Sequence, residues 1–274
     1  MPCDMSETWS GGRRAALYAL ASLLPLSALA QTQAQAPQPQ PQPLAQELLE
    51  QADRARNPGQ AFTFTNSMTE FKNGQPVYRA RFNVMSKTDR RNSQYRNLVT
   101  FVAPAEDIGK RLLLGGEVLW FFDPGSGSTV RVSPQQRLQG QVSNGDVLTL
   151  NLAHDYAATA ASDDSILDDQ QARRRARKLI LEARTDIAIY ARAEYWIDAA
   201  NLLPIKGRYF ADSGKLLKTI YFSAYKPVLG GTRPTEMTVI DEFDPSRITK
   251  MVLADFTAAD IPDVRFQRQF LSKP

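Results

Sequence analysis

The chain has 274 residues, of which 43% are hydrophobic, and a formal net charge of +4 from 33 basic and 29 acidic side chains. This weak positive balance does not indicate a nucleic-acid-binding protein, although it is compatible with anionic lipid surfaces or acidic partners. The only cysteine is Cys3, so the rest of the chain has no disulfide, thiol nucleophile or thiolate metal site.

The first thirty residues have the pattern of an export signal. Arg13 and Arg14 precede the apolar stretch AALYALASLLPLS, which is too short to span a bilayer, and Ala28-Leu29-Ala30 provides the small residues of a cleavage site. We therefore predict a cleavable signal peptide over residues 1–30. Cys3 lies far upstream of the cleavage site, so we expect the exported protein not to be lipidated.

A change of composition separates this signal from the folded part of the chain. Residues 31–43 read QTQAQAPQPQPQP, and such Pro/Gln alternation cannot bury a core, which predicts a semi-rigid, disordered linker. Residues 44–274 suit one large domain. It begins with LAQELLEQADRAR, where Leu44, Leu48 and Ala52 recur every four residues before Asn57-Pro58-Gly59, and this spacing predicts a short N-terminal helix.

After this helix the hydrophobic period changes to two, which is typical of strands. In VYRARFNV, Tyr78, Ala80, Phe82 and Val84 share one face, and Asn73-Gly74 just upstream predicts a hairpin. Further strands are predicted at residues 94–104, 110–116, 119–122, 130–132, 176–184, 190–198, 203–210, 215–225, 235–241 and 248–256. Residues 143–175, which are rich in Ala and Asp, break the alternation and predict short helices and loops. The tail after Asp260 predicts a short closing helix.

These elements define a mainly β (α+β) fold: a curled antiparallel sheet that forms an incomplete β-barrel. The concave face of such a sheet must hold side chains or a ligand. The helical stretch near residues 146–175 and the N-terminal helix are the candidates for a lid across its mouth.

Several segments occur in an order shared with one protein family. They read VAP and GKRLLL within residues 102–114, LWFFDP at 119–124, RVSPQQRLQG at 131–140, NGDVLTLNL at 144–152, LLPIKGRYFADSGKLLKTIYF at 202–222 and RPTEMTVID at 233–241. Together they resemble the LolA-like outer-membrane lipoprotein-sorting proteins, in particular the group associated with RND/MMPL-type transporters. The resemblance covers nearly all of residues 44–274.

The resemblance implies a half-barrel with a helical lid, whose apolar trough binds acyl chains of a lipoprotein or lipid in the periplasm. It further implies a monomer that carries this cargo toward the outer membrane and has an RND/MMPL-type inner-membrane transporter as a possible partner. The alternative is a periplasmic adaptor or sensor that docks on such a transporter without carrying lipid.

The sequence departs from the family pattern in two places. The family often has a small-Ser-Asp-Phe cluster where this chain reads Asn144-Gly145-Asp146-Val147. Classical carriers also have an arginine, followed by proline, that ties the lid to the barrel. The nearest position here is SKTDRRN, so Arg90 and Arg91 are the lid-latch candidates, although neither precedes a proline.

Catalytic, metal and cofactor chemistry is poorly represented. His154 is the only histidine and lies beside Asp155, but no nucleophile occurs in a recognisable motif around them. One imidazole without a cluster gives neither a triad nor a metal site. We therefore predict a protein that is not an enzyme and needs no cofactor or metal.

The positive case depends on apolar side chains, because an acyl chain of ~16 carbons costs on the order of 12 kcal/mol to expose to water. In LWFFDP, we expect the face formed by Trp120 and Phe122 to point into the trough and the face formed by Leu119 and Phe121 to point away. For each candidate the alternative is a packed core. The candidate lipid-binding residues are Trp120, Phe122, Phe82, Phe101, Leu181 and Tyr195.

Overall fold

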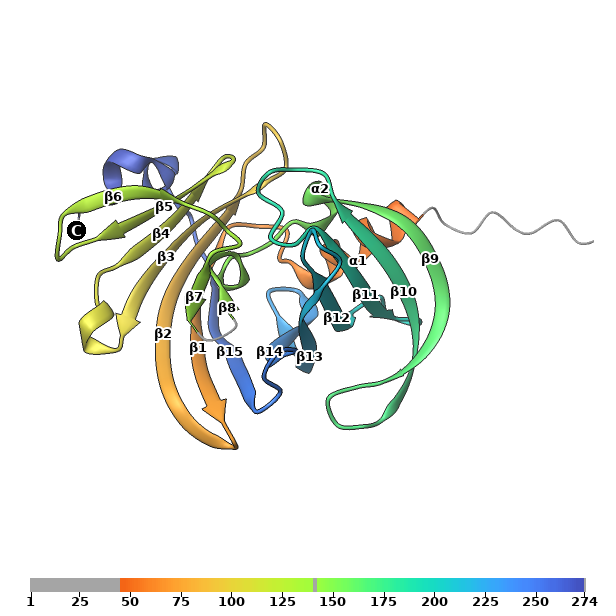
Figure 1. Ribbon diagram of the computed structural model, residues 1–274. Coiled ribbons are helices and arrows are strands. Elements are labelled where there is room, and N and C mark those ends of the chain that lie inside the picture. The colour runs from red at the N-terminus through yellow and green to blue at the C-terminus, as the bar shows by residue number, and fades with distance from the viewer. Residues whose placement is uncertain (1–44, 140–141, 274) are drawn as a thin grey trace, which may run out of the picture. The chain divides into compact units, whose positions relative to one another are not determined.

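The computed structural model describes residues 45–139 and 142–273, which belong to one compact unit. The predicted signal peptide and linker, residues 1–43, lie outside the described residues, as does Leu44. The unit consists of a 13-stranded antiparallel sheet, a two-stranded sheet and a few short helices (Figure 1). Within the described residues no helix is both long and apolar enough to cross a membrane.

The large sheet is a meander with one long-range join. Its strand order is β6-β5-β4-β3-β2-β1-β15-β14-β13-β12-β11-β10-β9, so all neighbours are consecutive in the chain except β1 and β15. These two strands pair antiparallel, with Met68 opposite Met251. The strands are β1 (Phe62–Lys72), β2 (Gln75–Thr88), β3 (Tyr95–Ala103), β4 (Arg111–Gly115), β5 (Val118–Asp123), β6 (Ser128–Val132), β9 (Tyr156–Leu167), β10 (Arg173–Ala183), β11 (Arg192–Asp198), β12 (Pro204–Phe210), β13 (Leu216–Val228), β14 (Gly231–Asp241) and β15 (Arg247–Ala258).

The sheet curls but does not close, so the predicted open, mainly β fold is confirmed. Its two edges are β6 and β9, at the left and right of Figure 1. The chain between them forms the small sheet of β7 (Arg137–Gln139) and β8 (Val142–Ser143), followed by the 3-10 helix η2 (Asn144–Val147) and the helix α2 (Leu152–Asp155). We call residues 144–155 the cover segment.

The predicted strands lie where the period-two pattern indicated. Asn73 and Gly74 both have positive φ, 51° and 78°, and join β1 to β2 as the predicted hairpin. The strands predicted from residue 176 onward correspond to β10–β15. Local alternation is clearest in strands such as β1 and β2, where buried positions alternate with more exposed ones.

The expectation of helices and loops throughout residues 143–175 is wrong beyond Asp155. Residues Tyr156–Leu167 form β9, and Arg173 begins β10. As an edge strand β9 is mostly exposed after its first residues, so it has no apolar alternation for the sequence to reveal. The closing helix predicted after Asp260 takes the form of two short 3-10 helices, η3 (Asp263–Phe266) and η4 (Arg268–Phe270).

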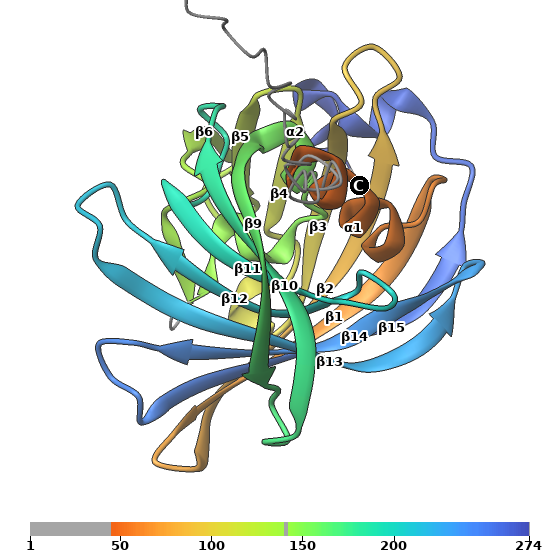
Figure 2. The same ribbon diagram turned by 90° about the vertical axis from the view of Figure 1, so that its right-hand side faces the viewer.

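Helix α1 (Ala45–Arg56) packs on the concave side of the sheet, beside α2, β9 and β14 (Figure 2). Its buried residues Leu48, Leu49 and Ala52 belong to the main hydrophobic core, which includes Phe82 and Tyr195. The helix ends immediately before Asn57-Pro58, where proline cannot continue it.

A smaller hydrophobic cluster covers the opposite face of β3–β5. The C-terminal tail supplies Ile261, Phe266 and Leu271, and the strands supply Leu113 and Phe122, with further contributions from Leu98 and Trp120. Both faces of the LWFFDP strand are therefore buried, by the main core on one side and by the C-terminal tail on the other.

Candidate functional site

A predominantly apolar cavity lies between the concave face of the sheet and the cover segment, with a volume of about 110 Å³. The central strands supply its floor, because their alternation directs every second side chain inward. On β1, for example, Phe62, Phe64, Asn66 and Met68 are buried while the intervening threonines and serine are half-buried. The lining from the floor is Phe62, Phe64, Asn66, Ile220, Phe222, Met237, Val239, Met251, Leu253 and Phe256.

Three aromatic rings form a stack at one end of this floor. The Phe64 and Phe256 centroids are 5.1 Å apart, and Phe62 lies 5.8 Å from Phe64 and 6.2 Å from Phe256. Such offset rings present flat apolar surface rather than interlocking branches. The sequence signal FTFTNSM, with its strict alternation, could have identified Phe62 and Phe64 as inward-facing, but our candidate residues did not include them.

The cover segment forms the roof and is anchored at Asp146. This carboxylate lies 2.6 Å from Lys218 Nζ of β13 and accepts a hydrogen bond from the Tyr190 hydroxyl at 2.7 Å. Both charged side chains are at most 5% exposed. Burial and the adjacent Asp146 charge hold the pKa of Tyr190 well above its ordinary value, so the hydroxyl remains a donor. The anchor therefore joins the roof to the sheet through a buried ion pair.

Further hydrogen bonds hold the roof at Thr149 and Leu150. Asn97 of β3 accepts from the Thr149 amide at 3.0 Å and donates to the Thr149 carbonyl at 3.1 Å. At the end of α1, Arg56 and Asn57 both donate to the Leu150 carbonyl, at 2.8 and 2.9 Å. The roof is thus fixed to β3 and to α1 through hydrogen bonds to its own main-chain groups.

The predicted latch residues occupy a different place. Arg90 and Arg91 are exposed in the β2–β3 loop, and Arg91 bonds its neighbour Asp89 at 2.8 Å. No described contact joins either guanidinium to the cover segment, which reaches this loop through Asn151, bonded to the Ser93 carbonyl at 2.7 Å, and through Gln94. The arginine that does bond the cover segment's main chain near the cavity is Arg56, so the latch expectation for Arg90 and Arg91 is wrong in position.

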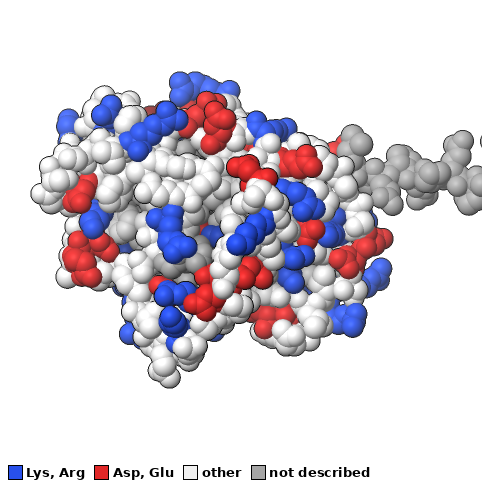
Figure 3. Space-filling view, in the orientation of Figure 1, with Lys and Arg blue, Asp and Glu red and all other residues white. Residues whose placement is uncertain are grey.

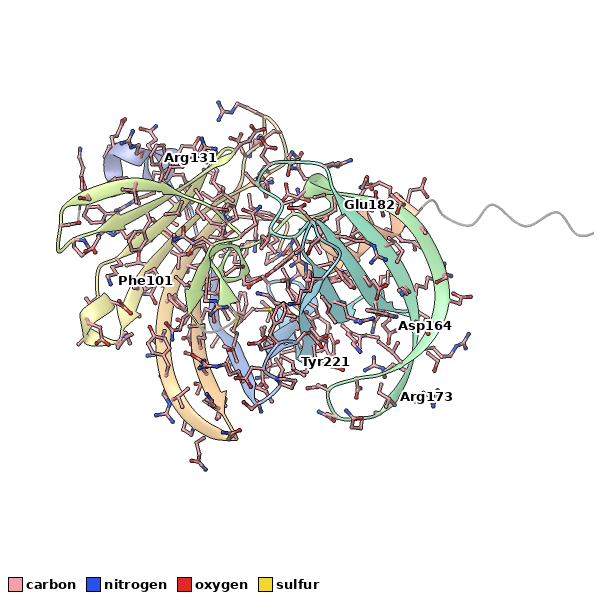
Figure 4. All side chains as sticks on the ribbon, in the orientation of Figure 1. Phe101, Arg131, Asp164, Arg173, Glu182 and Tyr221 are labelled. Carbon is pink, nitrogen blue, oxygen red and sulfur yellow. The ribbon has the colours of Figure 1, made fainter. Side chains whose placement is uncertain are left out.

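Four of the six predicted lipid-binding residues lie in the main core without lining the cavity. Phe82 and Phe101 pack edge to face at 4.9 Å, and Tyr195 contacts Phe222 behind the floor. Leu181 is 1% exposed in the same core. Figure 4 shows Phe101 in the half of the sheet formed by β1–β6. Their packing matches the alternative stated for each of them, an ordinary core position.

For Trp120 and Phe122 the predicted face is wrong. Their strand β5 directs Leu119 and Phe121 toward the main core and places Trp120 and Phe122 in the outer cluster. Arg268 of the C-terminal tail stacks over the Trp120 ring at 4.1 Å. Helix α1 lies on the concave side, whereas the C-terminal tail covers the convex one.

Replacing Trp120 with alanine is accordingly expected to reduce stability without affecting the cavity. The half-buried indole loses its contacts with the outer cluster and Arg268, which we expect to lower the free energy of unfolding by about 2 kcal/mol. Urea denaturation measures this loss, and titration of a fluorescent fatty-acyl probe measures the affinity per folded molecule. Weaker probe binding at unchanged stability would contradict this expectation and indicate that Trp120 contacts the ligand.

His154 and Asp155 form part of a hydrogen-bonded cluster at the end of the cover segment. His154 Nδ1 lies 2.9 Å from Asp155 Oδ1, which also accepts from Gln94 at 2.8 Å and Thr185 at 3.1 Å. Burial raises the pKa of Asp155. The residues that the structure describes contain no group of three or more His, Cys, Asp or Glu side chains placed to hold a metal ion.

The fold and the site together define a class: an open antiparallel half-barrel with an apolar cavity under a hydrogen-bonded cover. A family model described as "-like: Uncharacterized protein" matches residues 93–273, more than half of the chain. The chain belongs to a LolA-like family.

Solved structures share this fold over their whole length. A LolA superfamily protein from Nitrosomonas europaea is 28% identical, with a TM-score of 0.74 over 84% of this chain and 100% of its own. A DUF1329 family protein from Desulfovibrio piger is 19% identical, with a TM-score of 0.68 over 83% and 97%. An outer membrane lipoprotein-sorting protein domain from Vibrio parahaemolyticus is 17% identical, with a TM-score of 0.68 over 83% and 98%. No curated protein matches the chain.

Proposed function

We propose that the protein is a periplasmic carrier that binds acyl chains of a lipoprotein or lipid in this cavity and moves them toward the outer membrane, without chemical turnover. The observation that carries the proposal is the apolar floor, with its Phe62, Phe64 and Phe256 stack, under a roof held by hydrogen bonds, a buried ion pair and apolar packing. Membership of the LolA-like family supports it. A predicted cleavable signal peptide supports the periplasmic location.

In this conformation the volume of the cavity is too small for a long acyl chain. At about 110 Å³ it is smaller than the ~150 Å³ cavities that admit a benzene-sized molecule. Binding therefore requires the roof to move away from the floor. The hydrogen bonds of Arg56 and Asn57 to Leu150 are the contacts that this opening would break. Each would be regained on closing, while the acyl chain gains about 0.8 kcal/mol for each CH₂ group removed from water.

Filling the cavity tests the proposal. Met237 is half-buried on the floor, and Met237→Trp should occupy the space and weaken binding of a dansyl-labelled fatty acid by about tenfold or more. Thr238→Trp is the matched control, because the adjacent residue of β14 points to the opposite face of the sheet. Fluorescence titration gives both affinities, and chromatography of the recovered probe shows whether it is chemically unchanged.

The outcomes separate the carrier from other functions. Saturable binding that Met237→Trp weakens and Thr238→Trp preserves supports the carrier. Equal affinity in both variants would place the probe elsewhere on the protein. Absence of binding would favour the adaptor or sensor, and recovery of a hydrolysed probe would indicate an enzyme. Docking to an RND/MMPL-type transporter remains part of the proposal and is tested separately, by co-purification with such a transporter.

A further inference from the structure

One wall of the predominantly apolar cavity contains a buried guanidinium without an acidic partner among the described residues. Arg233, on β14, is 7% exposed and donates through NH1 to the Ala55 carbonyl at the end of α1. Its Nε is buried without a hydrogen-bond partner among the described residues, and none of the described carboxylates forms an ion pair with it. Because burial opposes the charged form, the pKa of Arg233 is lowered from its ordinary value.

The contrast with Arg56 shows what Arg233 lacks. Arg56 lies at the same end of α1 and lines the same cavity, and its Nε is also buried without a hydrogen-bond partner among the described residues. The difference is that the NH2 of Arg56 bonds Asp53 at 2.7 Å. Both carboxylate oxygens of Asp53 already accept a hydrogen bond, because the second one accepts from the Ala153 amide at 2.7 Å. Glu50, the other acid nearby, pairs with Arg54. A buried cation without a counter-ion is costly, so its retention in an apolar wall indicates an anion supplied from outside the chain.

A second polar group in the same cavity is also without a partner. Asn66 occupies an inward position of β1 between Phe64 and Met68 and is 1% exposed. Its Oδ1 has no hydrogen-bond partner among the described residues. Buried amides are normally hydrogen-bonded, so Asn66 provides a further site for a polar group of a ligand.

Arg233 also lies where the cavity meets the surface. Arg233 and Asn57 line both the apolar cavity and a larger outer hollow of about 740 Å³. Polar and charged residues predominate in the lining of the outer hollow, whose remaining members are Glu50, Asp53, Arg54, Gly59, Ser93, Tyr95, Asn151, Ala153, His154 and Arg184. Figure 3 shows lysine and arginine interspersed with acidic residues on the face it displays. A molecule with its tail in the cavity would place its head beside Arg233.

From this geometry we infer that the ligand is an amphiphile with an anionic head, a carboxylate or a phosphate, which Arg233 binds while the tail occupies the cavity. The inference rests on the proposed function and adds the chemistry of the head group to it. The planar guanidinium offers Nε and NH2 as paired donors, the geometry that carboxylates and phosphates accept. The Oδ1 atom of Asn66 accepts a hydrogen bond from a donor group farther along the ligand.

The test compares three ligands with the same saturated chain: dodecanoate, dodecyl phosphate and the neutral dodecanol. Each displaces a fluorescent acyl probe from the wild-type chain and from Arg233→Met, Arg233→Lys and the control Arg54→Met. Arg54 lines the outer hollow but pairs only with Glu50 at the surface. Titrations below the micelle concentration give the affinity ratio of each anion to the alcohol.

We expect the wild-type chain and Arg54→Met to bind at least one anion about tenfold or more tightly than dodecanol. Arg233→Met should bring the ratio close to one while retaining dodecanol binding, and Arg233→Lys should retain part of the preference. A stronger response to dodecanoate assigns a fatty acid, and a stronger response to dodecyl phosphate assigns a phospholipid head. Both outcomes support the inference.

Two results would overturn the inference. Equal wild-type affinity for all three ligands would contradict the preference for an anionic head group. It would not contradict the binding of acyl chains in the cavity. The same would follow if Arg233→Met kept the wild-type ratio. Failure of the wild-type chain to bind any of the three would reject the carrier proposal itself. If Arg233→Met does not fold, the wild-type ratio and Arg233→Lys still decide the question.

Discussion

Replacing Asp146 with alanine is expected to lower the free energy of unfolding by about 3–5 kcal/mol. The substitution removes the carboxylate that lies 2.6 Å from the buried Lys218 ammonium and deprives the Tyr190 hydroxyl of an acceptor at 2.7 Å. Removing one member of a buried pair costs more than the pair is worth, because the remaining charge stays buried and loses that partner. Urea denaturation followed by tryptophan fluorescence measures the change.

The control for this substitution is Glu50→Ala, which breaks an ion pair on the exposed side of α1. Glu50 and Arg54 are 3.9 Å apart, with side chains 48% and 68% exposed, so the loss should be about 0.5 kcal/mol or less. Asp146→Asn keeps the side-chain shape and tests the charge alone. Hydrogen exchange of residues 144–152 should accelerate in the Asp146 variants. Similar losses for Asp146→Ala and Glu50→Ala would mean that the ion pair does not anchor the roof.

Phe82→Ala is expected to cost about 3–5 kcal/mol of stability and to leave acyl-probe affinity per folded molecule unchanged. Phe82 is fully buried and packs edge to face against Phe101 at 4.9 Å, but it does not line the cavity. Removal of its ring therefore leaves a void in the core rather than enlarging the binding site. Thermal and urea unfolding measure the first effect, and probe titration of the folded fraction measures the second.

Phe243→Ala is the matched control, since this phenylalanine is 49% exposed and contacts mainly the Lys215 side chain. We expect its loss to cost less than about 1 kcal/mol. A weaker probe affinity in Phe82→Ala than in Phe243→Ala, at equal folded fraction, would show that the void communicates with the cavity. Phe82 would then regain the role that the sequence suggested for it.

The sequence predicted the strands well because alternation is a local property. The hairpin at Asn73-Gly74 and the strands from residue 176 onward can be predicted from neighbouring residues alone, without information on distant contacts. The edge strand β9 was missed for the complementary reason: with little of it buried, its sequence has no apolar period to detect.

The candidate site was less accessible to sequence analysis, because the period of two identifies two faces without saying what covers each one. Trp120 and Phe122 were assigned to the cavity, but the C-terminal tail more than a hundred residues later covers them. Asn66 carries a signal that could have been used, since it is a polar residue in an inward register between Phe64 and Met68. Nothing in the sequence around Arg233 indicates that this residue lacks an acidic partner. That depends on the hydrogen bonds that Asp53 makes in the folded protein.

The pairing of β1 with β15 has a consequence for how the chain folds. Met68 meets Met251 across the middle of the sheet, so the strands that complete its centre come from opposite ends of the domain. Contacts so distant in sequence give a high contact order, which slows folding because the loop must close before the pairing is rewarded. A ribosome-bound or partly translocated chain that lacks β15 would expose the edges of β1 and β14. We therefore expect the half-barrel to form only after residue 258 has emerged, with chaperones covering the two unpaired edges until then.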